Sequence, residues 1–132
     1  LNQTKMKTGK HLQMSLKTKW FKMTKIGEKT EDYREINEYW FKRLVYNWKD
    51  LFLTRKMSQP TQENIENILN RGCFGFNDFD INIMTLGYPK SSDSERILIF
   101  EHAGIEIGYG NPEWGAEPNK LYFIIKHGKR LQ

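Results

Sequence analysis

Hydrophobic and polar residues alternate near the start of the chain and through its second half, and this alternation predicts β-strands. Residues 11–17 carry three apolar side chains on one face and three polar ones on the other. The later strands are predicted at residues 79–85, 96–101, 104–109 and 121–126. A tight connection at residues 102–104 is expected to join the second and third of these.

A change from period two to spacings of three and four predicts a short helix after the first strand. Residues 19–26 show this spacing, with Thr18 as the capping residue. Gly27 ends the helix, because glycine enters the left-handed conformation without a Cβ clash.

The strongest helical pattern covers residues 37–52, where aromatic and aliphatic side chains form one stripe. Such a stripe is typical of core packing, although its aromatics would also suit base stacking. Residues 51–56 are expected to finish as a strand, and residues 58–60 as a turn. Thr61 then caps a helix over residues 62–70.

A charged segment at residues 29–36 follows the first helix and is predicted as a strand. Its alternation places Thr30, Asp32 and Arg34 on one face, with Lys29 at the start of the strand. This pattern suits a polar binding or catalytic site. It is also typical of a solvated edge strand that carries ion pairs.

A loop rich in glycine and proline, residues 110–118, separates the last two strands. It carries Trp114 and two carboxylates, Glu113 and Glu117. A loop with a large aromatic side chain is either a lid packed on the core or a recognition surface.

Length and composition predict one folded domain. The chain has 132 residues with four Trp, eight Phe and six Tyr, enough for a single hydrophobic core. Residues 1–10 are polar and aperiodic, so we expect a flexible arm or an added leader there, and a domain at residues 11–132.

The net charge of +5 is unevenly distributed. Residues 1–56 hold 14 Lys and Arg against 6 Asp and Glu, whereas residues 57–132 hold 7 against 10. A basic half suggests a polyanionic partner, most simply nucleic acid, although it also fits ordinary solubility charge.

Several chemistries lack their signatures. The three histidines have no metal-ligand spacing, and there is no glycine-rich phosphate loop, so neither a metal nor a cofactor is expected. Cys73 is the only cysteine, which suggests a buried thiol in a reducing, cytoplasmic setting. No apolar run approaches the roughly 20 residues that span a bilayer, so no membrane association is expected.

Residues 12–36 resemble the signature of the ASCH domain. The resemblance is carried by Met14-Ser15-Leu16-Lys17, by Trp20-Phe21 and by Gly27-Glu28-Lys29-Thr30-x-Asp32-Tyr33-Arg34. Residues 108–115 are also similar to the end of small phage and bacterial ASCH proteins. The resemblance implies a PUA-like β-barrel, and the predicted segments agree with an α+β fold of about five to seven strands and about three helices.

The ASCH resemblance implies a module that binds RNA, single-stranded nucleic acid or a nucleotide. Lys17 and Arg34 would contact phosphate, Trp20 or Trp114 would stack on a base, and Asp32 would read a base edge. The expected ligand-binding residues are Ser15, Lys17, Trp20, Arg34, Glu113 and Trp114.

A hydrolase is the alternative that the resemblance implies. Some ASCH-type proteins hydrolyse acylated cytidine with a Lys and a Thr of this strand and a distant Glu, and related domains are linked to RNA cleavage. Lys29 matches the Lys, but Asp32 stands where the Thr is expected, and Thr30 lies between them. Glu106 and Glu113 are candidates for the distant Glu. A Lys29–Asp32 pair, with Thr30 nearby, would be the catalytic group.

Overall fold

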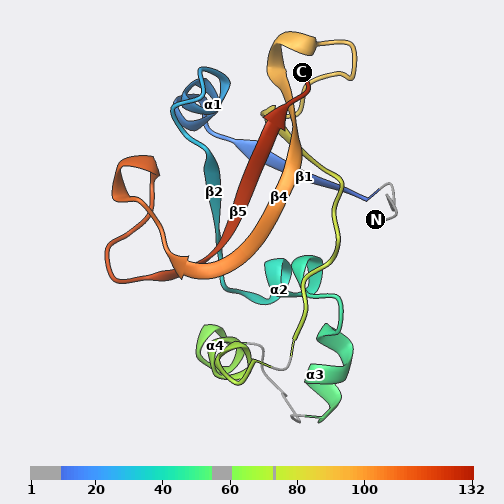
Figure 1. The fold of residues 1–132 in the computed structure, drawn as a ribbon, viewed down its shortest axis with the longest axis vertical. Coiled ribbons are helices and arrows are strands. Elements are labelled where there is room, and N and C mark those ends of the chain that lie inside the picture. The colour runs from blue at the N-terminus through green and yellow to red at the C-terminus, as the bar shows by residue number, and fades with distance from the viewer. Residues whose placement is uncertain (1–9, 55–60, 73) are drawn as a thin grey trace.

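The computed structural model describes residues 10–54, 61–72 and 74–132, without the side chains of residues 52–54, and shows an α+β fold around one five-stranded sheet (Figure 1). The strand order is β1-β3-β4-β5-β2, with β1 and β3 parallel and all other neighbours antiparallel. The strands are β1 (His11–Leu16), β2 (Glu31–Glu35), β3 (Ile81–Leu86), β4 (Ile97–Tyr109) and β5 (Leu121–Arg130). The predicted arm apart from Lys10, the predicted turn at residues 58–60, the end of the predicted strand at residues 55–56 and the predicted buried thiol of Cys73 lie outside the described residues.

Four α-helices lie at opposite ends of the sheet in the described part of the chain. In Figure 1, α1 is near one end, and α2, α3 and α4 gather at the other. The helices are α1 (Thr18–Lys25), α2 (Glu38–Leu44), α3 (Trp48–Thr54) and α4 (Gln62–Asn70), with short 3-10 turns η1 (Ser94–Arg96) and η2 (Pro112–Trp114). None of the helices described is both long and apolar enough to cross a membrane.

The sheet curls into a half-barrel that stays open between β1 and β2. Strand β4 is continuous, so the prediction of two strands joined at residues 102–104 is wrong. The register between β4 and β5 instead shifts on both sides of His102, and Gly104 takes a positive φ of 118°. A bulge of this kind bends a strand and increases its twist, which lets β4 follow the curve of the sheet.

The helix predicted at residues 37–52 is two helices. Val45 leaves the helical conformation and forms an isolated bridge with Phe76, so α2 ends at Leu44. The segment from residue 51 to residue 54 continues α3 as a helix, which makes the predicted strand there wrong. Periodicity did not reveal the break, because the residues after it resume the same apolar spacing.

Of the residues predicted to begin or end helices, one is wrong and two agree with the structure. Thr18 is the first residue of α1 rather than its cap, and Lys17 holds the capping position without a side-chain hydrogen bond. Gly27 has a φ of 83°, as expected for the residue that ends this helix. The helix at residues 62–70 is confirmed, and the Thr61 hydroxyl accepts a hydrogen bond from the Asn64 amide at 3.3 Å.

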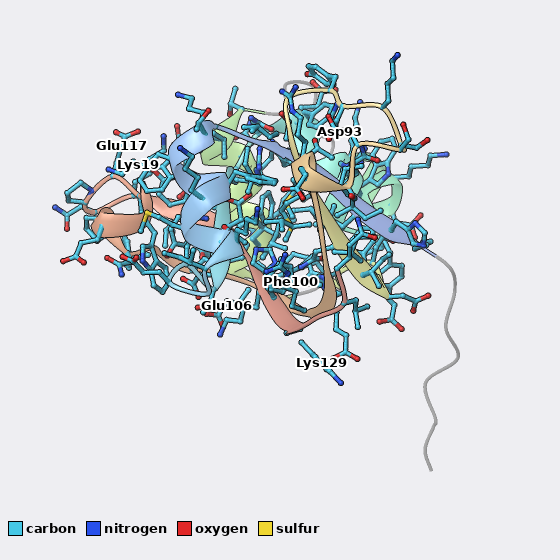
Figure 2. All side chains as sticks on the ribbon, turned by 90° about the horizontal axis from the view of Figure 1, so that it is seen from above. Lys19, Asp93, Phe100, Glu106, Glu117 and Lys129 are labelled. Atoms are coloured by element: carbon cyan, nitrogen blue, oxygen red, sulfur yellow. The ribbon has the colours of Figure 1, made fainter. Side chains whose placement is uncertain are left out.

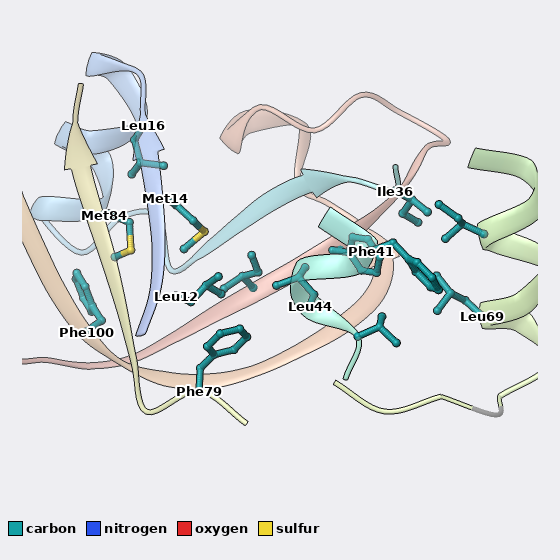
Figure 3. Close-up of a cluster of buried hydrophobic side chains, with 14 of the residues drawn as sticks. Leu12, Met14, Leu16, Ile36, Phe41, Leu44, Leu69, Phe79, Met84 and Phe100 are labelled. Carbon is teal, nitrogen blue, oxygen red and sulfur yellow. The ribbon is translucent and has the colours of Figure 1, made fainter. Parts of the chain in front are cut away.

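One hydrophobic core runs from the concave face of the sheet to α2 and α4 (Figure 3). Strand β1 alternates fully, with Leu12, Met14 and Leu16 buried. The other buried members are Phe21, Ile36, Phe41, Leu44, Val45, Leu51, Ile65, Ile68, Leu69, Phe79, Met84, Leu98, Phe100, Phe123 and Ile125. Because this core joins the helices to the sheet, it holds the ends of β1 and β2 in place.

Phe41→Ala should lower the free energy of unfolding by about 3–5 kcal/mol, because Phe41 is fully buried and truncation leaves a cavity. Urea denaturation measures this loss. Ile26→Ala is the control, since Ile26 is 73% exposed and its truncation should cost less than about 0.5 kcal/mol. Similar losses for the two variants would contradict the described core.

Candidate functional site

A buried ion triad lies at the centre of the charged strand. The Asp32 side chain is 9% exposed and the Lys29 side chain is 1% exposed. Lys29 Nζ donates to Asp32 Oδ1 at 3.0 Å, while Arg34 Nε and Nη2 donate to Asp32 Oδ2 at 2.9 and 2.6 Å. Both carboxylate oxygens therefore have cationic donors.

The pKa of Asp32 reflects two opposing effects. Burial raises the pKa, while the charges of Arg34 and Lys29 and their hydrogen bonds lower it. The net shift is downward, so the carboxylate stays ionised below its usual range. A carboxylate stabilised in this way is a weak base.

Lys29 lies inside the protein, not at the open start of β2 as the pattern suggested. Its ammonium also donates to the Glu31 carbonyl at 2.6 Å and lies 5.6 Å from the centre of the Tyr33 ring. Lys29 thus binds both the backbone of β2 and the Asp32 carboxylate from the interior of the protein.

Arg34 links the two edges of the half-barrel. Its Nη2 donates to the Ser15 carbonyl of β1 at 3.1 Å, and its guanidinium carbon lies 5.0 Å from the centre of the Trp40 ring. Nη1 makes no hydrogen bond to the described residues. Arg34 therefore bridges β2 to β1 and keeps one amino group for a ligand.

A pocket of about 270 Å³ occupies the opening between β1 and β2. Six residues predicted from the sequence line it: Ser15, Lys17, Trp20, Asp32, Arg34 and Trp114. Thr30 and Glu113 are exposed and lie outside the lining, and Lys29 is buried beneath Asp32. Glu106 pairs with Lys126 at 3.3 Å and is also outside the lining.

The loop after β4 packs against the outer face of the sheet and forms one wall of the pocket. The Asn111 amide donates to the Tyr33 hydroxyl, and the Glu117 amide donates to the Tyr122 hydroxyl, both at 2.9 Å. Burial raises the pKa of Tyr33, whose hydroxyl donates to Glu31, so this contact persists over the physiological range. The sequence left two alternatives for the loop, a lid packed on the core or a recognition surface. These hydrogen bonds correspond to the packed lid.

Trp20 of α1 and Gly115 of the loop meet at the rim of the pocket. Gly115 has a φ of 102°, and a Cβ there would lie 2.9 Å from the Trp20 ring. Glycine is thus required both by conformation and by the close approach of the indole. Figure 2 shows Lys19 of α1 and Glu117 of the loop at the same end of the molecule.

The carboxylates around the pocket are paired. Lys120 Nζ lies 2.8 Å from Glu35 and 3.2 Å from Glu117, and its hydrogen bond to Glu35 is the main cause that raises the pKa of Lys120. Lys17 makes no ion pair with the described residues. The pocket therefore presents the Lys17 ammonium for an anion, while Lys120 offsets one of the two negative charges of Glu35 and Glu117.

The unpaired edge of β2 also faces this opening. The His127 amide donates to the Thr30 carbonyl, so Thr30 belongs to a hydrogen-bonded pair with β5. Alternation along an antiparallel pair then directs the backbone N–H and C=O of Tyr33 away from β5. A ligand in the pocket can meet one donor and one acceptor of this edge.

Sequence reasoning did not assign six of the lining residues to the site: Leu16, Tyr33, Glu35, Gly115, Glu117 and Tyr122. Tyr122 lies opposite Glu35 in the β2–β5 register, and that pairing is not visible in either segment alone. The presence of Glu113, Trp114 and Glu117 in one loop was the feature of the sequence that could have pointed to Glu117.

A polar network is buried on the far side of Asp32. The Asn82 amide nitrogen donates to the Lys126 carbonyl at 3.1 Å and to His127 Nδ1 at 2.8 Å, and its oxygen contacts His102 Nδ1 at 2.7 Å. Because Nδ1 of His127 accepts, the proton of the neutral ring is on Nε2, which is buried and has no hydrogen-bond partner among the described residues. Burial is the main cause that lowers the pKa of His127 to about 4.

Among the described residues, no group of three His, Cys, Asp or Glu side chains could hold a metal ion. Comparisons of this chain with protein-family models, curated proteins and solved structures found no match.

Lys29→Met should lower the free energy of unfolding by about 3–5 kcal/mol, because it removes one partner of a buried ion pair. Chemical denaturation measures the loss. Lys126→Met is the matched control, since Lys126 pairs with Glu106 at the exposed surface and should cost less than about 1 kcal/mol. Equal losses in the two variants would show that the buried ion pair contributes no more to the free energy of unfolding than the exposed pair does.

Stability should fall as the pH drops from about 6.5 to about 4. His127 has a lower pKa folded than unfolded, so the unfolded chain binds the extra proton first, and up to about 3 kcal/mol is lost across this window. Denaturation at several pH values measures the slope. His127→Gln should flatten it, whereas His11→Gln, on the exposed face of β1, should not. An unchanged slope in His127→Gln would contradict this assignment.

Proposed function

We propose that the protein is a binding module for RNA or a nucleotide, and that one base with its phosphate occupies the pocket between β1 and β2. The observation that carries this proposal is the convergence of Trp20 and Trp114 with Lys17 and Arg34 on that pocket. Aromatic rings beside cations are the groups that bind an unpaired base and its backbone.

Each group has a role in the proposed complex. Trp20 or Trp114 stacks on the base, and Lys17 with the Nη1 of Arg34 contacts the phosphate. The backbone edge at Tyr33 offers a donor and an acceptor to the base edge. Asp32 orients Arg34 through their ion pair. The Asp32 side chain is 9% exposed and lies beside the backbone edge at Tyr33.

The ASCH resemblance supports the same function. The five-stranded half-barrel and the α+β fold are consistent with a PUA-like barrel. Part of the residues that carry the resemblance line the pocket, among them Ser15, Lys17, Trp20, Asp32 and Arg34. We therefore propose an ASCH-type, PUA-like module.

The geometry favours binding over hydrolysis. Lys29 is buried and outside the pocket lining, and both oxygens of Asp32 accept hydrogen bonds from cations. Thr30 is exposed outside the pocket. A catalytic base must reach the substrate and bind its proton; Lys29 does not line the pocket, and the cations beside Asp32 lower the pKa of that carboxyl and make it a weak base.

Lys17→Glu should reduce the affinity for a short single-stranded RNA about 10- to 100-fold, because a hydrogen bond to a charged group contributes about 1.5–3 kcal/mol. Fluorescence anisotropy with labelled octanucleotides measures the affinity at low and high salt. Lys22→Glu is the matched control, since it makes the same charge change on α1 outside the pocket lining. Equal effects of the two variants would contradict a specific site.

The hydrolase alternative is tested with the unsubstituted protein. Acylated cytidines and the same RNAs are incubated with it and analysed by chromatography. We expect no turnover alongside measurable binding. Turnover that disappears in Asp32→Asn, with ligand affinity and fold intact, would overturn the binding proposal in favour of an enzyme.

A further inference from the structure

A second pocket, of about 360 Å³, adjoins the first on the other side of Arg34. Its lining residues are Gln13, Met14, Ser15, Arg34, Tyr39, Trp40, Arg43, Thr85 and Tyr88. Ser15 and Arg34 line both pockets, so the two hollows lie next to each other along the opening between β1 and β2.

The charge of this second pocket is entirely positive. None of its lining residues is acidic, and two arginines converge on one indole: the guanidinium carbons of Arg34 and Arg43 lie 5.0 and 5.9 Å from the centre of the Trp40 ring. Arg43 makes no ion pair with the described residues. Arg34 already pairs with Asp32, whereas the charge of Arg43 has no such partner among the described residues, so an anion bound beside Arg43 would be stabilised.

Two tyrosine side chains around these arginines are exposed. Tyr39 is 63% exposed and Tyr88 is 96% exposed. The backbone amide of Trp40 donates to the Asn37 side chain at 3.0 Å, and the Trp40 ring contacts Tyr39 edge-on at 5.0 Å. The surface thus offers exposed aromatic rings beside the two arginines.

We infer that this second pocket binds the neighbouring nucleotide of a single RNA strand, with Arg43 and Arg34 on its phosphate and Tyr88 or Tyr39 against its base. The inference rests on the proposed function of the first pocket and extends it. It makes the ligand a strand of at least two nucleotides rather than a free nucleotide. A basic groove lined with aromatic rings is the arrangement by which proteins follow an unpaired strand.

Arg43→Ala and Tyr88→Ala test the inference. Both should weaken binding of a labelled RNA octanucleotide by roughly tenfold, because stacking and phosphate contacts at the second position are lost. Neither should change the affinity for nucleoside monophosphates, which are measured as competitors and fill only the first pocket. Tyr109→Ala is the matched control, since Tyr109 is 67% exposed on β4 and lines neither pocket.

The salt dependence separates the two roles. Arg43→Ala should reduce the slope of log affinity against log salt by about 0.7, as expected when one phosphate contact with a single strand is lost. Tyr88→Ala should leave that slope unchanged, because a tyrosine displaces no counterion.

Two results would overturn the inference while leaving the first pocket intact. One is an octanucleotide affinity that falls with Lys17→Glu but not with Arg43→Ala or Tyr88→Ala. The other is an equal loss of mononucleotide affinity in the second-pocket variants, which would make both hollows one site. If the unsubstituted protein binds neither oligonucleotide nor mononucleotide, the proposed function fails and the inference fails with it.

Discussion

The triad of Lys29, Asp32 and Arg34 is the constraint on which the candidate site depends. Asp32 is removed from water, so its charge requires partners, and a cation reaches each of its oxygens. Lys29 fills the interior below β2, while Arg34 extends across the opening to the Ser15 carbonyl. One buried carboxylate thereby fixes the orientation of the residue that joins the two unpaired edges of the sheet and lies between both pockets.

The open half-barrel gives this triad its functional setting. In a closed barrel, β1 and β2 would pair, and the backbone N–H and C=O groups of their outer edges would hydrogen-bond to each other. Here the edges stay apart, and α1 and the loop after β4 cover one part of the opening, while α2 borders another. The contact of Trp20 with Gly115 and the hydrogen bonds to Tyr33 and Tyr122 hold the loop in place. The pocket is therefore bounded by elements that are each fixed to the sheet.

Local pattern accounted for much of the fold. The alternation of β1 and the cap of α4 at Thr61 depend on neighbouring residues alone, and the structure confirms both. The errors arose where tertiary pairing overrides local pattern. Val45 leaves its helix to pair with Phe76, and the bulge in β4 replaces a turn because β5 continues alongside it. These outcomes depend on segments that are distant in the chain.

For the candidate site, the sequence by itself determined which chemical groups were available: a charged strand with Asp32 and Arg34, a nearby Lys17, and tryptophans in α1 and the loop. Spacing along one strand placed Asp32 and Arg34 together, since alternate residues share a face. Only the tertiary structure decided that Lys29 is buried, that Glu35 and Glu117 share Lys120, and that Tyr122 lies beside them. Burial and cross-strand register are set by how distant segments pack, and no local pattern of residues encodes them.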